Sequence, residues 1–330
     1  MIRPHGYQHR LVLICLGALW CASCQTPYHS PAERYIFVVT NSSLPYWQEA
    51  QSGFVEAGRE MGVKVEFAGP ASYSPQAELD AFKTAAASHP SGILVSPAQA
   101  DLFRNAIDEA VQSGIPVICV DSDSPRSRRI LFIGTDNYGA GLTIGGLIAA
   151  LMRQHGQLAV ITIPGQFNLD ERLRGLEDAL KPYPYLSFYQ VANDRGEPQV
   201  ADQEVSALLK QNPNVAGIVC VEASGGPGAA EAVDQIGDGG KVPIVAMDAN
   251  PETLDWVSKG VIGATVVQKP YTMGFYGLRF LDDLHHNSVH EFKNWQNAPA
   301  SPLPSFVDTG TEVINQSNVD DYRNALAAAR

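Results

Sequence analysis

Short apolar runs alternate with longer amphipathic stretches along most of this chain of 330 residues. This alternation constrains the fold more than any other feature, because strands that alternate with helices form βαβ units and a parallel sheet covered by helices. The runs that fit strands are residues 35–40, 63–68, 92–96, 116–121, 131–134, 158–163, 186–191, 217–221, 243–248 and 262–268. The sequence therefore predicts an α/β protein.

The run at residues 35–40 leads into a helix that its spacing predicts in detail. The helix begins at Pro45 and ends before Gly62, a residue that favours the position after a last helical turn. Its apolar residues recur every three or four positions and form one stripe: Trp47, Ala50, Phe54, Ala57 and Met61. Tyr46 and Trp47 start this helix beside a strand's carboxyl end, where α/β sheets bind ligands. The two rings either pack in the core or line a binding site.

The strand pattern occurs twice. Ten strands are too many for one compact sheet of typical size. Residues 35–135 and residues 157–268 each run through about five strand–helix steps. We therefore expect two similar doubly wound lobes with a cleft between them. Residues 287–304 interrupt the pattern and predict an extended loop, and residues 319–329 predict a terminal helix.

The N-terminus has the features of an export signal. Basic residues precede an apolar run at residues 11–20, and small residues follow it up to Cys24. The apolar run is too short to span a bilayer. Residues 22–24 resemble the end of a bacterial lipobox, in which Cys24 would carry the lipid. We expect a signal peptide at residues 1–24, a tether at residues 25–33 and a periplasmic or cell-envelope lipoprotein.

Charge and motif content exclude several classes of function. The net charge of −12 disfavours nucleic-acid binding, which needs a basic surface. Cys119 and Cys220 lie in apolar strand runs and predict buried thiols, not a disulfide or a metal site. Residues 225–228 lack the spacing of a phosphate loop, no HExxH motif occurs, and His285 and His286 are expected on an exposed helix end. No metal or cofactor is predicted.

Polar side chains stand at the carboxyl ends of most predicted strands: Asp121, Asp136, Glu222, Asp248 and Gln268. Carboxylates and amides bind adjacent hydroxyl groups, and aromatic faces pack on the C–H faces of a sugar ring. This set predicts a site for a polyhydroxylated ligand.

Some of these polar residues have a structural alternative. Asp136 precedes a predicted helix and can serve only as its N-cap, whereas Asp121 and Asp248 precede no immediate helix. Arg172 and Arg174 lie near the start of the predicted helix 169–180, where positive charge opposes the helix dipole. That conflict favours one of the two arginines facing an anion or hydroxyl groups.

Several of these segments together resemble the ribose-binding-like group of periplasmic sugar-binding proteins of ABC importers, which shares its lobes with LacI-type repressors. The resemblance covers residues 34–325. The segments that carry it are residues 40–47, 115–121, 133–137, 171–175, 244–248 and 264–270. It implies a type I periplasmic binding protein fold of two doubly wound lobes, acting as a monomer without a cofactor.

The resemblance also implies roles for single residues. Tyr46 and Trp47 match the aromatic pair that sandwiches the sugar. Glu222 stands where the family often has Asn, and Thr40 and Asn193 are further candidate ligand contacts. The residues that match hydroxyl-binding positions are Asp121, Arg174, Asp248 and Gln268.

Three crossovers between the lobes are implied near residues 135–136, 268–269 and 306–308, and these would form the hinge. The N-terminal lobe would then hold residues 34–135 and 269–305, and the C-terminal lobe residues 136–268 and 306–330. Departures from the pentose binders occur at Leu44, where they have Asn, at Ser122, where they have Arg, and at Asn193, where they have an aromatic residue. These departures point to a ligand other than ribose: a different sugar, a related polyol or a non-sugar compound.

Four functions remain to be weighed. The first is a substrate-binding lipoprotein that delivers its ligand to an ABC permease. The second is a periplasmic sensor that presents its closed form to a chemoreceptor or histidine kinase. The third is a glycoside hydrolase that uses Asp121 with Glu222 or Asp248. A transcriptional repressor is disfavoured, because an export signal replaces the DNA-binding head.

Overall fold

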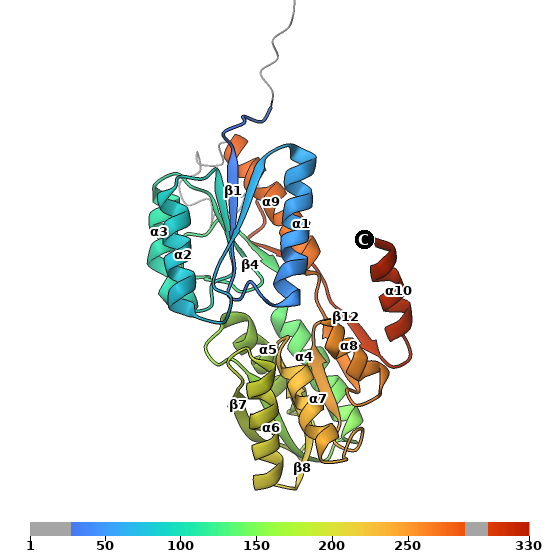
Figure 1. Cartoon of the computed structure of the whole chain (residues 1–330). Coiled ribbons are helices and arrows are strands. Elements are labelled where there is room, and N and C mark those ends of the chain that lie inside the picture. Colours follow the sequence, from blue (N-terminus) through green and yellow to red (C-terminus); the bar gives the residue numbers. More distant parts are fainter. Residues whose placement is uncertain (1–27, 288–302, 330) are drawn as a thin grey trace, which may run out of the picture.

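A computed structural model describes residues 28–287 and 303–329 of the chain. The signal peptide with Cys24, the first residues of the tether and most of the expected loop at 287–304 lie outside the described residues. The rest forms two α/β lobes, which lie one above the other in Figure 1. Within the described ranges, no helix has the length and apolar character that crossing a membrane requires.

The first lobe is built on one six-stranded sheet in the order β11-β5-β4-β3-β1-β2. All of its strand pairs are parallel. Its elements are β1 (Arg34–Val38), α1 (Pro45–Met61), β2 (Lys64–Ala68), α2 (Pro75–Ala87), β3 (Gly92–Val95), α3 (Ala100–Gln112), β4 (Val117–Val120), β5 (Phe132–Gly134), α9 (Pro270–His286) and β11 (Phe306–Asp308).

The second lobe repeats this arrangement in the order β12-β10-β9-β8-β6-β7, and only its edge strand β12 runs antiparallel. Its elements are α4 (Asn137–Leu151), β6 (Gly156–Thr162), α5 (Phe167–Leu180), β7 (Leu186–Asn193), α6 (Pro198–Gln211), β8 (Val215–Cys220), α7 (Gly225–Gln235), β9 (Ile244–Met247), α8 (Pro251–Ser258), β10 (Ala264–Val267), β12 (Glu312–Asn315) and α10 (Val319–Ala329). The prediction of two similar doubly wound lobes is confirmed.

Helix α1 forms where its spacing predicts. Its inward face buries the apolar stripe against the first sheet, in one core cluster with β1 and α9. Gly62 ends the helix in the left-handed conformation with a φ of 71°, and its N–H donates to the carbonyl of Gly58. An L-residue with a side chain adopts this conformation only with strain, so glycine sets the end of the helix.

Helices α4 and α5 pack closely in the second lobe because glycine lines their contact. A Cβ added to Gly141 on α4 would lie 2.1 Å from the carbonyl oxygen of Arg172 on α5. A Cβ added to Gly175 would lie 2.2 Å from the carbonyl oxygen of Tyr138. The close approach fixes the position of α5, which carries residues of the site described below.

The chain crosses between the two sheets three times. The first two crossovers follow β5 and β10, at the places expected from the sequence. The third lies between β11 and β12, because β11 pairs with β5 in the first sheet. Residues 306–308 form β11 and therefore belong to the N-terminal lobe, so their assignment to the C-terminal lobe is wrong. Hydrogen bonds join the crossovers: Thr309 N–H donates to the carbonyl of Gly134 (2.7 Å), and Asp136 N–H donates to Asp308 Oδ1 (3.1 Å).

A candidate binding pocket between the lobes

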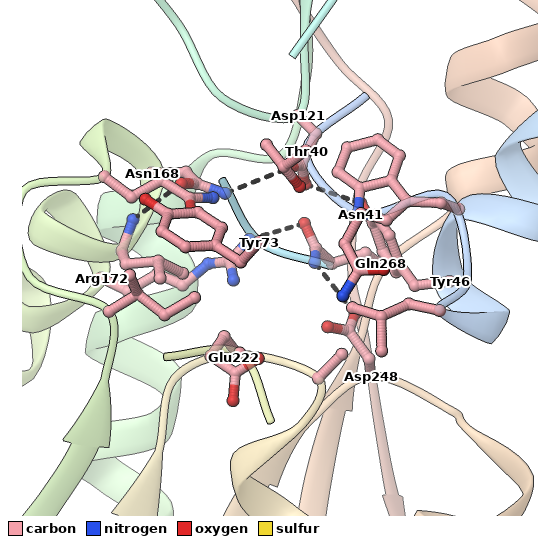
Figure 2. Close-up of a pocket in the computed structure, with 17 residues that line it drawn as sticks. Thr40, Asn41, Tyr46, Tyr73, Asp121, Asn168, Arg172, Glu222, Asp248 and Gln268 are labelled. Carbon is pink, nitrogen blue, oxygen red and sulfur yellow. Dashed lines mark hydrogen bonds between the residues drawn. The ribbon is translucent and has the colours of Figure 1, made fainter. Parts of the chain in front are cut away.

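A pocket lies between the lobes, at the carboxyl ends of strands from both sheets. Strand order reverses beside β1 in the first sheet and beside β6 in the second, and such switch points are where α/β sheets bind ligands. The lining residues are Thr40, Asn41, Leu44, Tyr46, Trp47, Tyr73, Asp121, Ile163, Gln166, Asn168, Leu169, Arg172, Gly196, Glu222, Ala223, Asp248 and Gln268. Figure 2 shows how the labelled side chains converge on this space.

Asp121 is the acidic group that the first lobe presents to the pocket. It follows β4 and is buried, and its carboxylate accepts hydrogen bonds from Tyr46 Oη (2.6 Å) and Asn168 Nδ2 (3.0 Å). Asn168 belongs to the second lobe, so this contact bridges the cleft. Burial raises the pKa of Asp121, and the positive charge of Arg172 opposes that rise.

Asp248 is its counterpart in the second lobe. It follows β9, the strand that matches β4 in the repeated topology. Burial raises the pKa of Asp248 to about 7, while Arg172 and a hydrogen bond from Gln268 Nε2 (2.9 Å) oppose the rise. Asp121 and Asp248 have φ values of 61° and 68°. Left-handed backbone in a residue other than glycine costs about 1–3 kcal/mol and concentrates at functional sites. The two lobes thus present equivalent aspartates in the same strained conformation.

Arg172 is the buried cation of the pocket, with a relative exposure of 1%. Its guanidinium donates to Asn137 Oδ1, to the carbonyl of Val221 and to Gln268 Oε1, each at 2.8 Å. Gln268 Oε1 also accepts from Thr135 Oγ1 (2.7 Å). The network therefore holds the arginine side chain in place and connects it to two of the crossovers.

Tyr46 and Trp47 belong both to the core and to the pocket. Trp47 packs edge-on against Phe37, with ring centroids 6.2 Å apart, and Tyr46 lies edge-on to Trp47 at 5.0 Å. Both rings are buried in the core cluster of the first lobe, and both line the cavity. The two rings therefore pack in the core and also line the candidate pocket, so their part in ligand binding stays a prediction.

Glu222 lines the pocket but is held by the backbone. Its carboxylate accepts N–H groups of Ser224 and Gly225 at the start of α7, a position that favours negative charge. Asp194 lies beside it and is fully buried. Burial, together with the charge of Glu222, raises the pKa of Asp194 well above its ordinary value.

Most of the site residues expected from the sequence come together here. Those that line the pocket are Thr40, Tyr46, Trp47, Asp121, Glu222, Asp248 and Gln268. Asp136 does not line it and caps α4 instead, accepting the N–H of Gly139 (2.9 Å). Both predicted thiols, Cys119 and Cys220, are buried and free.

Two expected site residues lie elsewhere, and this corrects the sequence interpretation. Arg174 is on the outer face of α5, where it pairs with Glu171 and stacks over the ring of Tyr138 at 4.4 Å. Asn193 is exposed at the end of β7 and accepts the N–H of Arg195 in a turn (2.9 Å).

The helical spacing of α5 explains why Arg172, not Arg174, faces the pocket. The buried face of α5 includes Leu169, Arg172, Leu176 and Leu180, three or four residues apart, so Arg172 lies in the stripe. Arg174 lies two positions further along and therefore on another face. The pocket residues that the sequence did not single out are Asn41, Tyr73, Ile163, Gln166, Asn168, Leu169, Gly196 and Ala223.

The chemistry of the pocket suits a neutral ligand with many hydroxyl groups. Two buried carboxylates accept hydrogen bonds, one guanidinium donates them, and amides do both. Because Asp121 and Asp248 outnumber Arg172, an anionic ligand would add repulsion in a region of weak screening. Apolar and aromatic walls from Leu44, Trp47 and other residues complete the cavity.

Comparisons with known proteins agree with this architecture. The periplasmic binding protein domain family matches residues 35–286. The D-allose-binding periplasmic protein of Escherichia coli K12 is 26% identical over 295 residues, which cover 86% of this chain and 93% of that protein. The crystal structure of a sugar ABC transporter sugar-binding protein from Bacillus halodurans is 35% identical with a TM-score of 0.75, covering 88% of this chain and 99% of that one. The XylFII–LytSN complex contains a chain that is 26% identical with a TM-score of 0.78, covering 86% and 98%.

Proposed function

The chain belongs to the periplasmic binding protein domain family, in its ribose-binding-like type I group, and from this premise we propose that it is the substrate-binding lipoprotein of an ABC transporter. It captures a monosaccharide or related polyol between its lobes and presents the closed form to a permease. The observation that carries the proposal is the pair of equivalent buried aspartates, one from each lobe, that face one pocket together with Arg172.

The residues proposed to bind the ligand are those that the pocket brings together. Asp121 and Asp248 accept hydroxyl hydrogens, and Arg172 and Gln268 donate to hydroxyl oxygens. Tyr46 and Trp47 pack on the ring, while Thr40 and Glu222 supply further polar contacts. Arg174 and Asn193 have no part in the proposal.

Closure on the ligand would occur at the crossovers. Hinge motions of two-lobed binding proteins concentrate in a few connecting residues. Here the connections are short and joined by hydrogen bonds from Thr135 to Gln268 and from Thr309 to Gly134. The bond from Asn168 to Asp121 spans the cleft and would form only when the lobes are close. We propose that ligand and lobe–lobe contacts together stabilise the closed form.

The sequence features at the N-terminus complete the proposal. Export with lipidation at Cys24 would place the protein in the periplasm or cell envelope, held by its lipid anchor, as a monomer that needs no cofactor. The relatives are named as sugar-binding or transport proteins, which favours binding over catalysis and weighs against a glycoside hydrolase.

A sensor remains the second candidate. A chain similar to this one was solved in the XylFII–LytSN complex, which supports a protein partner other than a permease. In that case the closed form would be read by a chemoreceptor or histidine kinase. Uptake of radiolabelled ligand in cells that carry or lack this chain separates the two: an importer requires the chain for uptake, whereas a sensor does not.

A thermal-shift screen of monosaccharides, polyols and nucleosides tests the proposed ligand class. A ligand that binds only the folded state stabilises it by about 2.7 kcal/mol at a concentration one hundred times its Kd. We expect one sugar or polyol to raise Tm in the native chain but not in the Asp121→Asn variant. Arg174→Ala is the matched control and should keep the shift. No shift with any compound would contradict the proposal.

A further inference from the structure

Four metal-binding side chains gather at the opposite end of the first lobe from the pocket. His29 and Glu33 lie on the segment that leads into β1, and Asp282 and His286 lie on the last turns of α9. The chain enters the lobe at this end, beside α9, as Figure 1 shows. The cluster is thus remote from the sugar site and serves none of its contacts.

Four of the six distances between the ligand atoms are close to those of a tetrahedral zinc site. His29 Nδ1 lies 3.0 Å from Glu33 Oε2 and 3.4 Å from Asp282 Oδ1. His286 Nε2 lies 3.2 Å from the same Glu33 oxygen and 3.5 Å from the same Asp282 oxygen. All four atoms lie within 4.8 Å of one another. Zinc bonds of about 2.0–2.1 Å in a tetrahedron place neighbouring ligand atoms about 3.4 Å apart.

The charge balance at this point favours a bound cation. The side chains of Glu33 and Asp282 are each 7% exposed, and those of His29 and His286 are 19% and 18% exposed. In the part of the chain that the structure describes, neither carboxylate forms an ion pair with lysine or arginine. Buried carboxylates need compensation. One divalent ion bound by all four side chains would neutralise the two carboxylates.

The surroundings orient the ligands as in built metal sites. Glu33 Oε1, the oxygen that does not face the cluster, accepts the backbone N–H of Ser30 (2.6 Å). Tyr35 Oη donates to Asp282 Oδ1 (2.9 Å). The ring of Tyr28 stacks on His286 at 4.5 Å and covers the cluster on one side. Such outer hydrogen bonds fix ligand orientation, and losing one typically costs 10–100-fold in metal affinity.

We propose that His29, Glu33, Asp282 and His286 form a structural zinc site. Four protein ligands that leave no open position are typical of structural zinc, and a set of two imidazoles and two carboxylates suits zinc better than magnesium, which prefers six oxygens. The ion ties the segment before β1 to the end of α9, and so holds the start of the folded domain where the tether arrives. Asp282 and His286 are four residues apart on one face of α9, so the helix holds two of the four ligands at a fixed distance from each other.

Zinc titration of the full-length chain tests the site. The chain is stripped with a chelator, dialysed, and titrated with zinc against a chromophoric chelator. We expect one zinc per chain, and a loss of affinity of at least about 100-fold in the double variant His29→Gln with His286→Gln. His285→Gln is the matched control, because it removes a neighbouring histidine on the same helix, and should bind zinc as the native chain does.

A second measurement does not depend on any variant. X-ray absorption of the zinc-loaded native chain should give four nitrogen or oxygen neighbours at about 2.0–2.1 Å. Zinc should also raise Tm in the native chain, while calcium and magnesium should not. Absence of zinc binding, equal binding in the double variant, or sulfur neighbours in the absorption spectrum would each overturn the proposal and leave the cluster as a set of ion pairs.

Discussion

Replacing Arg172 with methionine is the sharpest test of how the pocket is built. Methionine fills much of the same volume but donates no hydrogen bond. Asn137 Oδ1 and the carbonyl oxygen of Val221 then each lose the hydrogen bond from Arg172, and among the residues it describes the structure shows no second donor to either of them. Gln268 Oε1 keeps the bond from Thr135. An unsatisfied buried acceptor costs about 1–3 kcal/mol, so we expect Arg172→Met to lower the free energy of unfolding by about 2–6 kcal/mol.

The same substitution also removes the charge that favours the ionised form of both aspartates. Arg172 lowers the pKa of Asp121 and of Asp248, opposing the effect of burial. Without it both pKa values rise, and Asp248, whose pKa is already about 7, becomes mostly protonated at neutral pH. A neutral carboxyl group is a weaker acceptor for a hydroxyl. Ligand binding should therefore be lost even at temperatures where the variant is folded.

The measurements are urea unfolding, which gives the midpoint and the m value, and the ligand-induced rise in Tm. Arg174→Met is the control on the same helix, since Arg174 is exposed, and it should leave both readouts unchanged. Arg172→Lys keeps the positive charge but loses the planar guanidinium with its paired donors. This variant should fold, but it should bind the ligand at least about tenfold more weakly. Native stability and binding in Arg172→Met, or lost binding in Arg174→Met, would refute the reasoning.

Three further outcomes follow from the structure. The pKa of Asp248 is about 7 in the folded chain against an ordinary 3.8, so the folded state holds this proton more tightly and stability falls as pH rises between these values. Asp248→Asn should remove up to about 4 kcal/mol of this pH-dependent loss of stability. Urea unfolding with the same pH dependence in the variant and the native chain would contradict this. Gly141→Ala should destabilise by about 1–3 kcal/mol in urea unfolding, because its Cβ would meet α5, whereas Gly146→Ala on the same helix meets nothing and should be neutral or stabilising. Trp47→Ala should cost about 3–5 kcal/mol and abolish the ligand-induced rise in Tm, and a native rise would show that the ring only packs the core.

The sequence predicts most of the architecture because the strands of a parallel sheet are buried on both faces. Such strands consist of continuous runs of apolar residues, which can be recognised in the sequence. All ten expected strands are present, and the repeated pattern gives the two lobes. The two strands that were missed, β11 and β12, are three and four residues long and lie at sheet edges. Phe306 and Asp308 are exposed, so little in their composition marks a strand.

The site was harder to predict than the fold because it depends on side-chain direction. The aspartates at the ends of β4 and β9 could be found, since each follows a wholly apolar strand. Arg172 could have been found from the stripe of α5, but the matched segment suggested Arg174. Asn168 and Tyr73 carry no signal of their own, because they reach the pocket only through the way the two lobes face each other.

Gln268 is shared between the pocket and a crossover, and this has a consequence for anyone who wishes to change the ligand. Its amide accepts hydrogen bonds from Arg172 and Thr135 and donates one to Asp248, so one side chain contacts residues of both lobes. A substitution there alters selectivity and the open–closed balance at once. A sensor engineered from this chain should therefore be retargeted first at Asn41 or Gln166, which line the cavity and form no side-chain bond across the crossovers among the described contacts.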